Sequence, residues 1–237
     1  MTQPPIPAPA PPAATARWLL RSRDRATLAT LLAGGLAGAP YASLVLTATA
    51  ADGAPLLLIS DLAQHTINIA GEKRVALLFD GTGELDEPLT GPRVTVLGHA
   101  ARCDDAPLRA RYLARHPSAA LYAGFADFHL YRVAIERAHL VAGFGRIDWI
   151  AAGDLLPPDI AALAADEAAL LDEINAGDAG ALLGGPGEGW RLTGIDAEGI
   201  DLRRAGTVAR RAFPAPVADA AAARAALARL AAASRGA

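Results

Sequence analysis

The stretch that decides the fold is Tyr41-Ala-Ser-Leu-Val-Leu-Thr-Ala-Thr-Ala50, followed by Asp52-Gly53 and then by Pro55-Leu-Leu-Leu-Ile-Ser60. β-Branched side chains recur through its first part, at Val45 and Thr47 among others, and they favour an extended chain. A glycine after an aspartate accepts the positive φ angle of a tight hairpin turn. The pattern therefore predicts two antiparallel strands joined by a hairpin turn.

Further strands are predicted on both sides of this hairpin. They cover residues 27–31, 75–80, 93–103, 128–137 and 138–144, and Gly98 predicts a β-bulge in the third of them. Short helices are predicted at residues 15–25, 61–72, 106–115 and 118–126, the first with Arg21 on its solvent side. About six strands with short connections favour a closed or half-closed β-barrel.

The composition changes after Pro157-Pro158, which we interpret as a domain boundary. Beyond it we predict a helix at residues 159–175, strands at 190–195, 199–204 and 208–213, and a helix at 218–234. Together these elements predict a small α+β domain over residues 157–237. Residues 1–16 are rich in Pro and Ala and carry no charge, which predicts a disordered tail.

Composition excludes several classes of protein. The chain has 237 residues, with 22 basic and 25 acidic side chains, so it lacks the strongly basic character of a general nucleic-acid binder. Its single cysteine, Cys103, excludes a disulfide scaffold and a cysteine-based zinc site, and we expect no metal cluster. Because we find neither a secretory signal nor a long apolar segment, we expect a cytoplasmic protein without a membrane partner.

Common catalytic motifs are absent, including the Walker phosphate loop, His-Glu-x-x-His and Gly-x-Ser-x-Gly. His65 is set apart because it lies in the first turns of a helix predicted to follow a strand. The free N–H groups and positive dipole end of such a helix can bind a phosphate. The candidate donors are Ser60, Gln64, His65 and Thr66. An ordinary helix capped by Ser60 or Asp61 is the simpler alternative.

Six motifs follow one another along residues 17–150. They are Leu58-Ile-Ser-Asp-Leu-Ala-Gln-His-Thr-Ile-Asn68, Val75-Ala-Leu-Leu-Phe-Asp80, Pro92-Arg-Val-Thr-Val-Leu-Gly98, His116-Pro-Ser-Ala119, Tyr122-Ala-Gly-Phe-Ala-Asp-Phe128 and His139-Leu-Val-Ala-Gly-Phe-Gly-Arg146. In this order they resemble the pyridoxamine 5'-phosphate oxidase-like FMN-binding split barrels, and more narrowly their haem-utilisation (HugZ-type) branch. Residues 190–202 are similar to the small C-terminal domain that often follows this barrel.

The resemblance implies a six-stranded split barrel and a homodimer with two equivalent cofactor sites at its interface. By position, Ser43 stands where relatives place an arginine for the FMN phosphate. Gln64 and His65 stand where the oxidases carry an Arg-Lys pair for the same phosphate. Arg93 and Thr95 lie on the strand that passes the flavin in relatives.

Departures from the family pattern bear on the cofactor. Ile67 replaces an arginine that is usual in this branch, and Glu173-Ile-Asn-Ala-Gly-Asp178 replaces a stretch that usually contains two histidines. From Leu140 to the end there is no His, Cys, Met or Tyr, the usual ligands of haem iron. A haem ligand is therefore expected among the barrel histidines, which are His65, His99, His116, His129 and His139.

Three functions remain open at this point. The first is an FMN-binding oxidoreductase acting on a small molecule, in which the flavin performs the electron chemistry. The second is a haem-binding or haem-degrading utilisation protein, as the branch suggests. The third is a dimeric binding module without a cofactor.

Overall fold

The computed structural model describes residues 10–83, 85–143, 145–155, 161–183 and 189–235. The chain divides into two compact units, Ile6–Leu156, called here the barrel unit, and Pro157–Ala237, called the C-terminal unit. Among the described helices, none is both long enough and apolar enough to cross a membrane.

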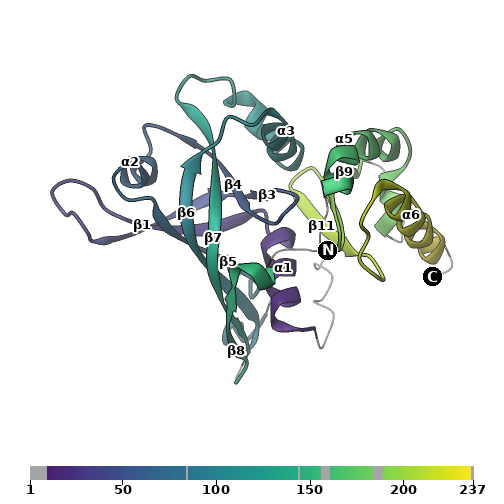
Figure 1. Ribbon diagram of the computed structural model, residues 1–237, viewed down its shortest axis with the longest axis horizontal. Helices are drawn as coiled ribbons and strands as arrows, with labels where there is room; N and C mark the ends of the chain where they lie inside the picture. Colours follow the sequence, from purple (N-terminus) through teal and green to yellow (C-terminus); the bar gives the residue numbers. More distant parts are fainter. Residues whose placement is uncertain (1–9, 84, 144, 156–160, 184–188, 236–237) are drawn as a thin grey trace. The chain divides into compact units, whose positions relative to one another are not determined.

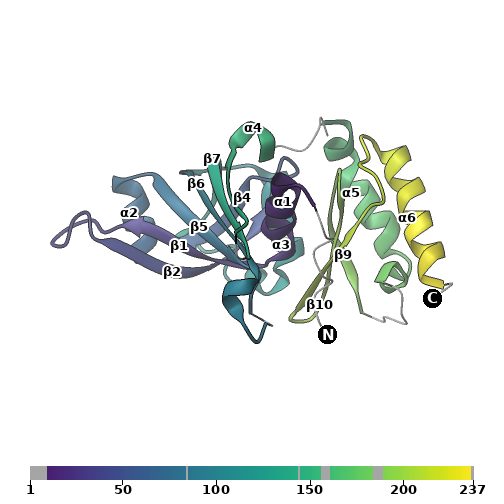
Figure 2. The ribbon, with the colours of Figure 1, turned by 90° about the horizontal axis from the view of Figure 1, so that it is seen from below.

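The barrel unit is built on one curled antiparallel sheet (Figure 1, Figure 2). Its strands are β1 (Arg25–Leu31), β2 (Pro40–Leu46), β3 (Ala48–Thr49), β4 (Pro55–Ser60), β5 (Arg74–Asp80), β6 (Pro92–Arg102), β7 (Phe128–Ala142) and β8 (Ile147–Ala151). They run in the order β2-β1-β5-β6-β7-β4-β3, and β8 pairs with β7. The predicted α+β class, with a split barrel and short helices, is confirmed.

Strand alternation gives this sheet a buried inner face and an outer face that α3 (Ala106–Arg115) and η2 (Pro117–Leu121) cover over β3, β4 and the start of β7 and that is more exposed elsewhere. On β6, Val94 and Val96 are fully buried, whereas Arg93 and Thr95 between them are only half-buried. Successive side chains of a strand point to opposite faces, so Val94 and Val96 belong to the inner core, while Leu56, Leu58 and Leu130 form a second buried cluster with α3 on the other face. Leu19 of α1 (Pro12–Ser22) packs into the inner core.

The strands differ from the prediction in number and length. The segments predicted as two strands at 128–137 and 138–144 form one 15-residue strand, β7. The predicted bulge at Gly98 is confirmed, because the register of β6 against β7 shifts between Leu97 and Gly98. The predicted strand 41–50 is interrupted at Thr47, whose carbonyl accepts a hydrogen bond from His116 Nε2 at 2.9 Å. Strand β8 was not predicted.

The helices of the barrel unit are α1 (Pro12–Ser22), α2 (Gln64–Gly71), η1 (Pro88–Thr90), α3 (Ala106–Arg115), η2 (Pro117–Leu121) and α4 (Ala152–Leu155). α3 has the predicted bounds. α1 begins with a proline, which suits a first helical position, so residues 12–16 are helical and not part of a disordered tail. The helix predicted at 118–126 is only the 3₁₀ turn η2, because the chain there makes i to i+3 hydrogen bonds.

The start of α2 also differs from the prediction. The helix begins three residues later than expected, and its N-cap is Ala63, which offers no side-chain cap. Ser60 Oγ instead accepts a hydrogen bond from the Leu62 amide at 3.0 Å, so it stabilises a turn ahead of the helix. Neither Ser60 nor Asp61 caps α2.

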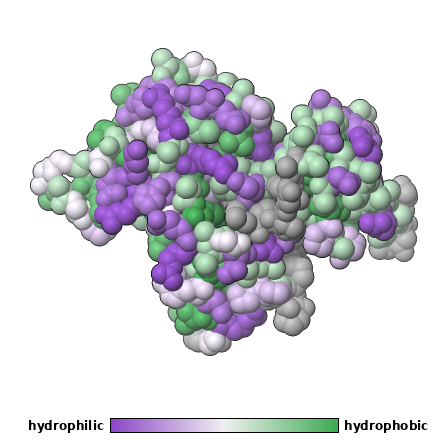
Figure 3. Space-filling view, viewed as in Figure 1, coloured by the Kyte–Doolittle hydropathy of each residue, from purple (hydrophilic) through white to green (hydrophobic). Residues whose placement is uncertain are grey.

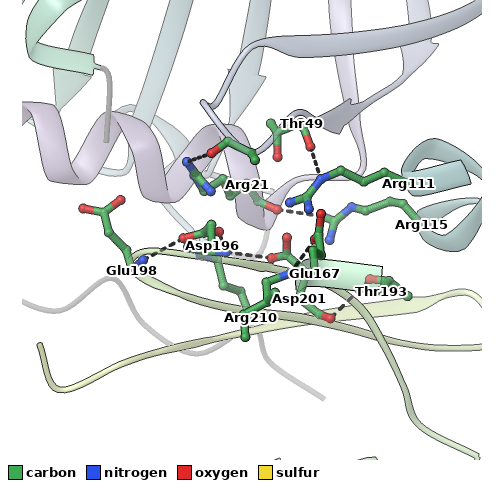
Figure 4. A network of polar contacts seen from close by, with 12 residues as sticks. Arg21, Thr49, Arg111, Arg115, Glu167, Thr193, Asp196, Glu198, Asp201 and Arg210 are labelled. Atoms are coloured by element: carbon green, nitrogen blue, oxygen red, sulfur yellow. Dashed lines mark hydrogen bonds and ion pairs between the residues drawn. The ribbon is translucent and has the colours of Figure 1, made fainter. Parts of the chain in front are cut away.

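Arg21 is buried and not on the solvent side of its helix, since only 1% of its surface is exposed. Its guanidinium donates to the Ala51 carbonyl at 3.3 Å, and its own carbonyl accepts from Arg115 at 2.8 Å. Figure 4 shows Arg21 and Arg115 together with Arg111, which donates to the Thr49 carbonyl. Backbone carbonyls supply acceptors that a helical pattern of charges does not reveal, which is why the prediction was wrong.

The C-terminal unit is a small α+β structure. Its elements are α5 (Ala161–Asn175), η3 (Ala179–Leu183), β9 (Arg191–Asp196), β10 (Gly199–Arg204), β11 (Thr207–Ala212) and α6 (Ala220–Arg235). The strands form an antiparallel sheet in the order β11-β10-β9. The first two residues of the predicted helix 159–175 lie outside the described residues.

A buried ion cluster belongs to this sheet (Figure 4). Arg210 donates to both carboxylate oxygens of Asp196, at 2.8 and 3.0 Å, and to Asp201 at 2.9 Å. The two carboxylates hold the guanidinium in its charged form, so they raise the pKa of Arg210 against the opposing effect of its burial. Paired in this way, the three charges are tolerated in the interior.

Gly98 gives a direct test of the barrel register. A Cβ atom at this position would lie 2.2 Å from the Ala134 carbonyl oxygen of the neighbouring strand. We expect Gly98→Ala to destabilise the protein by about 1–3 kcal/mol, because the strands must separate to admit the methyl group. Urea unfolding measures the shift. Gly71→Ala is the control, since nothing lies within 4 Å there; equal midpoints for both variants would contradict the bulge geometry.

Candidate cofactor site

The start of α2 brings together two of the predicted phosphate-binding residues. Ser43 lies on β2 opposite Leu28 of β1, and His65 lies in the first turn of α2. Ser43 Oγ and His65 Nδ1 are 3.1 Å apart, within hydrogen-bond distance. Ser43 and His65 are 22 positions apart, and the sequence pattern alone gave no reason to pair them. Only the family resemblance placed both residues at the phosphate site.

The environment of His65 disfavours a positive charge. Burial lowers the pKa of its imidazole. Its Nε2 atom is buried and has no hydrogen-bond partner within the described part of the chain. At neutral pH the ring is therefore uncharged, and it cannot supply the charge of the lysine or arginine that it replaces.

Two of the other predicted donors near α2, Ser60 and Gln64, already form hydrogen bonds within the protein. Ser60 Oγ donates to the Asp127 carboxylate at 2.5 Å, and Gln64 Nε2 donates to Asn68 Oδ1 at 2.8 Å. Thr66 Oγ1 is buried and has no partner among the described residues. The carboxylate of Asp127 beside Ser60 disfavours an anion at this position.

Arg93 and Thr95 lie on the opposite face of the sheet from Ser43. On β6 they alternate with the buried Val94, whereas on β2 Ser43 shares the face of the buried Val45. Arg93 Nη1 donates to the backbone carbonyls of Leu89 and Gly91, at 3.0 and 3.2 Å. The structure thus divides the predicted site residues between two faces and does not bring them all together.

Arg93 and Thr95 instead belong to a larger exposed surface. Strand register places Thr95 beside His139 on β7 and beside Leu78 on β5. The same cross-strand row continues from one edge of the sheet to the other. In order it contains Trp149, His139, Thr95, Leu78, Thr27 and Leu44, and we call it the outer row.

One end of the outer row is aromatic and basic. The rings of His139 and Trp149 lie 4.5 Å apart at an interplanar angle of 30°. The guanidinium of Arg137 lies 4.2 Å above the ring of Trp149, a favourable cation–π arrangement. The sequence analysis missed Trp149 because β8 was not predicted, although Ile147 and Trp149 alternate there with Asp148 as in a strand.

The low pKa of His65 has a consequence for stability. The unfolded chain binds a proton near the ordinary value of 6.5, whereas the folded chain resists it. Stability from this group is therefore present above pH 6.5 and is lost as the pH falls toward the lower folded pKa. We expect the His65 resonance in NMR to titrate below 6.5, and His65→Gln to lose less stability between pH 7 and pH 5.5 than the parent. An ordinary His65 titration would contradict this expectation.

Comparisons with known proteins agree with this architecture. Residues 7–157 match the family described as CREG, beta-barrel. The protein Atu2129 of Agrobacterium tumefaciens, of unknown function, has a crystal structure that is similar with a TM-score of 0.78 and 32% identity, over 97% of this chain and 100% of that one. A heme binding protein from Mycobacterium smegmatis is similar with a TM-score of 0.58 and 28% identity, over 96% and 99% of the two chains.

A curated relative is the chloroplastic non-canonical heme oxygenase HOZ of Arabidopsis thaliana. It is 36% identical over 109 residues, which are 45% of this chain and 33% of that protein. This chain thus matches about a third of the length of that relative. The family match covers more than half of the chain, and the curled antiparallel sheet agrees with it. The chain belongs to the CREG β-barrel family, within the pyridoxamine 5'-phosphate oxidase-like split-barrel superfamily.

Proposed function

We propose that this protein binds haem on the outer face of its barrel, between two copies of the chain. The observation that carries the proposal is the outer row, in which the exposed apolar side chains of Trp149, Leu78 and Leu44 lie in one line with polar side chains, and arginines lie on the same face. The names of two relatives, a heme oxygenase and a heme binding protein, support the same ligand. We propose haem binding and no reaction, because the oxidoreductase activity expected from the sequence has less support than haem binding has.

The chemistry of the outer face fits a haem group. The macrocycle is flat and apolar, and its two propionates are anionic. Leu78, Val141 and Trp149 offer apolar contacts. Arg93 and Arg137 lie on the same face, where their guanidinium groups suit a carboxylate. When bound, haem supplies redox and oxygen chemistry, and the protein binds, orients and covers it.

FMN is the second candidate, and one observation favours it. The N-terminus of α2 has no side-chain cap, so the amides of Gln64 and His65 are available to a phosphate. The neutral ring of His65 and the carboxylate of Asp127 act against an anion there. The FMN site predicted from Ser43, Ser60, Gln64, His65 and Thr66 therefore remains a weaker proposal than haem.

The predicted homodimer is proposed through the same outer face. Leu44, Ile147 and Trp149 are 71%, 62% and 55% exposed, which is unusual for large apolar side chains in a monomer. The β1–β2 hairpin adds Leu36, which is 71% exposed, and its tip at the left of Figure 3 is white and green, not purple. A two-fold related copy of the chain that packs on this surface would remove these apolar side chains from water.

A titration decides among the three functions. We expect the purified full chain to bind hemin saturably, with a shifted absorption band near ~400 nm, and to bind FMN much more weakly. Bovine serum albumin and buffer give the background for non-specific hemin uptake. Tight FMN binding that is lost in His65→Ala would favour the flavin reading, whereas binding of neither compound would favour a cofactor-free module.

A charge on the outer face should disrupt the dimer. We expect sedimentation of the parent at twice the 24.3 kDa chain mass, and a shift toward the monomer for Leu44→Arg, because the arginines of two copies would be buried without partners. Leu121→Arg is the matched control, since Leu121 is 82% exposed on η2, outside this face. Equal sedimentation of all three proteins would contradict the proposed interface.

A further inference from the structure

We propose that His139 ligates the haem iron through Nε2, with Arg137 beside it as the partner of a propionate. This inference rests on the proposed haem function and adds the residue that bonds the iron. A histidine that ligates haem iron must meet two conditions. Its Nε2 atom must be free of other partners, and it must lie on a surface that fits a porphyrin. Nε2 is the atom that matters, because the Cβ group next to Nδ1 crowds a flat macrocycle.

Two barrel histidines have Nε2 already engaged. His116 is buried, and its Nε2 donates to the Thr47 carbonyl at 2.9 Å, where it stabilises the break between β2 and β3. The Nε2 atom of His129 lies 3.1 Å from the Asp61 carboxylate. Ligation by either residue would break a contact of the fold.

His65 and His99 are excluded by their surroundings. Nε2 of His65 is buried, and its Nδ1 lies 3.1 Å from Ser43 Oγ on β2. His99 has a free Nε2, and its Nδ1 lies 3.3 Å from Glu136. Its neighbour across the strand is Arg74, which pairs with Glu72 at 2.6 Å, so His99 stands in a charged surface and not in an apolar one.

Tyr41 lies on the face of β2 that Ser43 and Val45 share, opposite the outer row, and the other three tyrosines of the barrel are poor alternatives. A tyrosine ligates iron as the phenolate, so a raised pKa opposes ligation. Burial raises the pKa of Tyr112, Tyr122 and Tyr131 above the ordinary value of 10. Cys103 follows β6, and its amide donates to the Leu130 carbonyl at the opposite end of β7 from His139, so it lies away from the outer row. Beyond His139 the sequence has no histidine, cysteine, methionine or tyrosine at all.

His139 meets both conditions. Its ring makes no hydrogen bond to any residue that the structure describes, so both nitrogens are available. Trp149 stacks on the ring and limits its rotation, while Thr95 and Leu78 continue the row beside it.

Arg137 completes the site. It lies two residues before His139 on β7 and therefore on the same face. Its guanidinium rests on the ring of Trp149 and forms no ion pair with a carboxylate of the described residues. A positive charge held beside an apolar row by an aromatic ring suits a propionate.

The experiment uses the full chain reconstituted with hemin. We expect His139→Ala to lower hemin affinity by about tenfold or more and to change the absorption spectrum, because the protein–iron bond is lost. His99→Ala is the matched control, since it removes the other solvent-accessible Nε2 of the same face, and it should leave the spectrum unchanged. Addition of imidazole to His139→Gly should restore the parent spectrum, which a merely structural role would not produce.

The outcomes separate this inference from the proposed function. If the parent binds no hemin, haem binding and the His139 assignment both fail. If the parent binds hemin and His139→Ala, folded by circular dichroism, keeps its spectrum and affinity, then haem binding stands and the assignment is overturned. A spectrum lost in His99→Ala and kept in His139→Ala would overturn it in the same way.

Discussion

The packing of β6 between β5 and β7 is the constraint on which the barrel unit depends. Val94 and Val96 are completely buried, so the register of β6 can hardly change. A slip by one residue would turn both valines outward and bring Thr95 into the core. Because the inner face is sealed in this way, Thr95 and its cross-strand neighbours must lie outside. The outer row is thus a consequence of how the core is packed.

Buried and exposed charges of the barrel unit have different surroundings. The guanidinium of Arg115 is buried and donates to the carbonyls of Arg21 and Arg23, at 2.8 and 3.2 Å, so its charge stabilises the chain around it. A buried cation without such acceptors would be very costly. On the outer face, Arg137 rests on Trp149 and the ring of His139 makes no hydrogen bond to a described residue. Groups that the fold itself does not use are available to a ligand.

Much of the fold could be predicted from the sequence, because its signals are local. The Asp52-Gly53 turn, the bulge at Gly98 and the bounds of α3 follow from turn chemistry, from glycine and from helical periodicity. The continuity of β7 and the existence of β8 could not be predicted, since both depend on pairing with strands far along the chain. The candidate site was harder to predict than the fold, because it depends on the same pairing between distant strands. The sequence pattern located His65 at a helix start, but the neighbourhood of His139 and Trp149 exists only through strand register.

The charged side chains buried in the C-terminal unit bind one another. In that unit the guanidinium of Arg210 is bound by Asp196 and Asp201, and all three side chains are almost completely buried. Each carboxylate is already paired with the guanidinium of Arg210. Removing one of the three side chains would leave an unpaired charge in the interior. The same unit has no histidine, cysteine, methionine or tyrosine to offer a metal. The buried charges of this unit therefore stabilise its own fold, whereas on β7 of the barrel unit the half-buried ring of His139 makes no hydrogen bond, and the exposed guanidinium of Arg137 no ion pair, with a described residue.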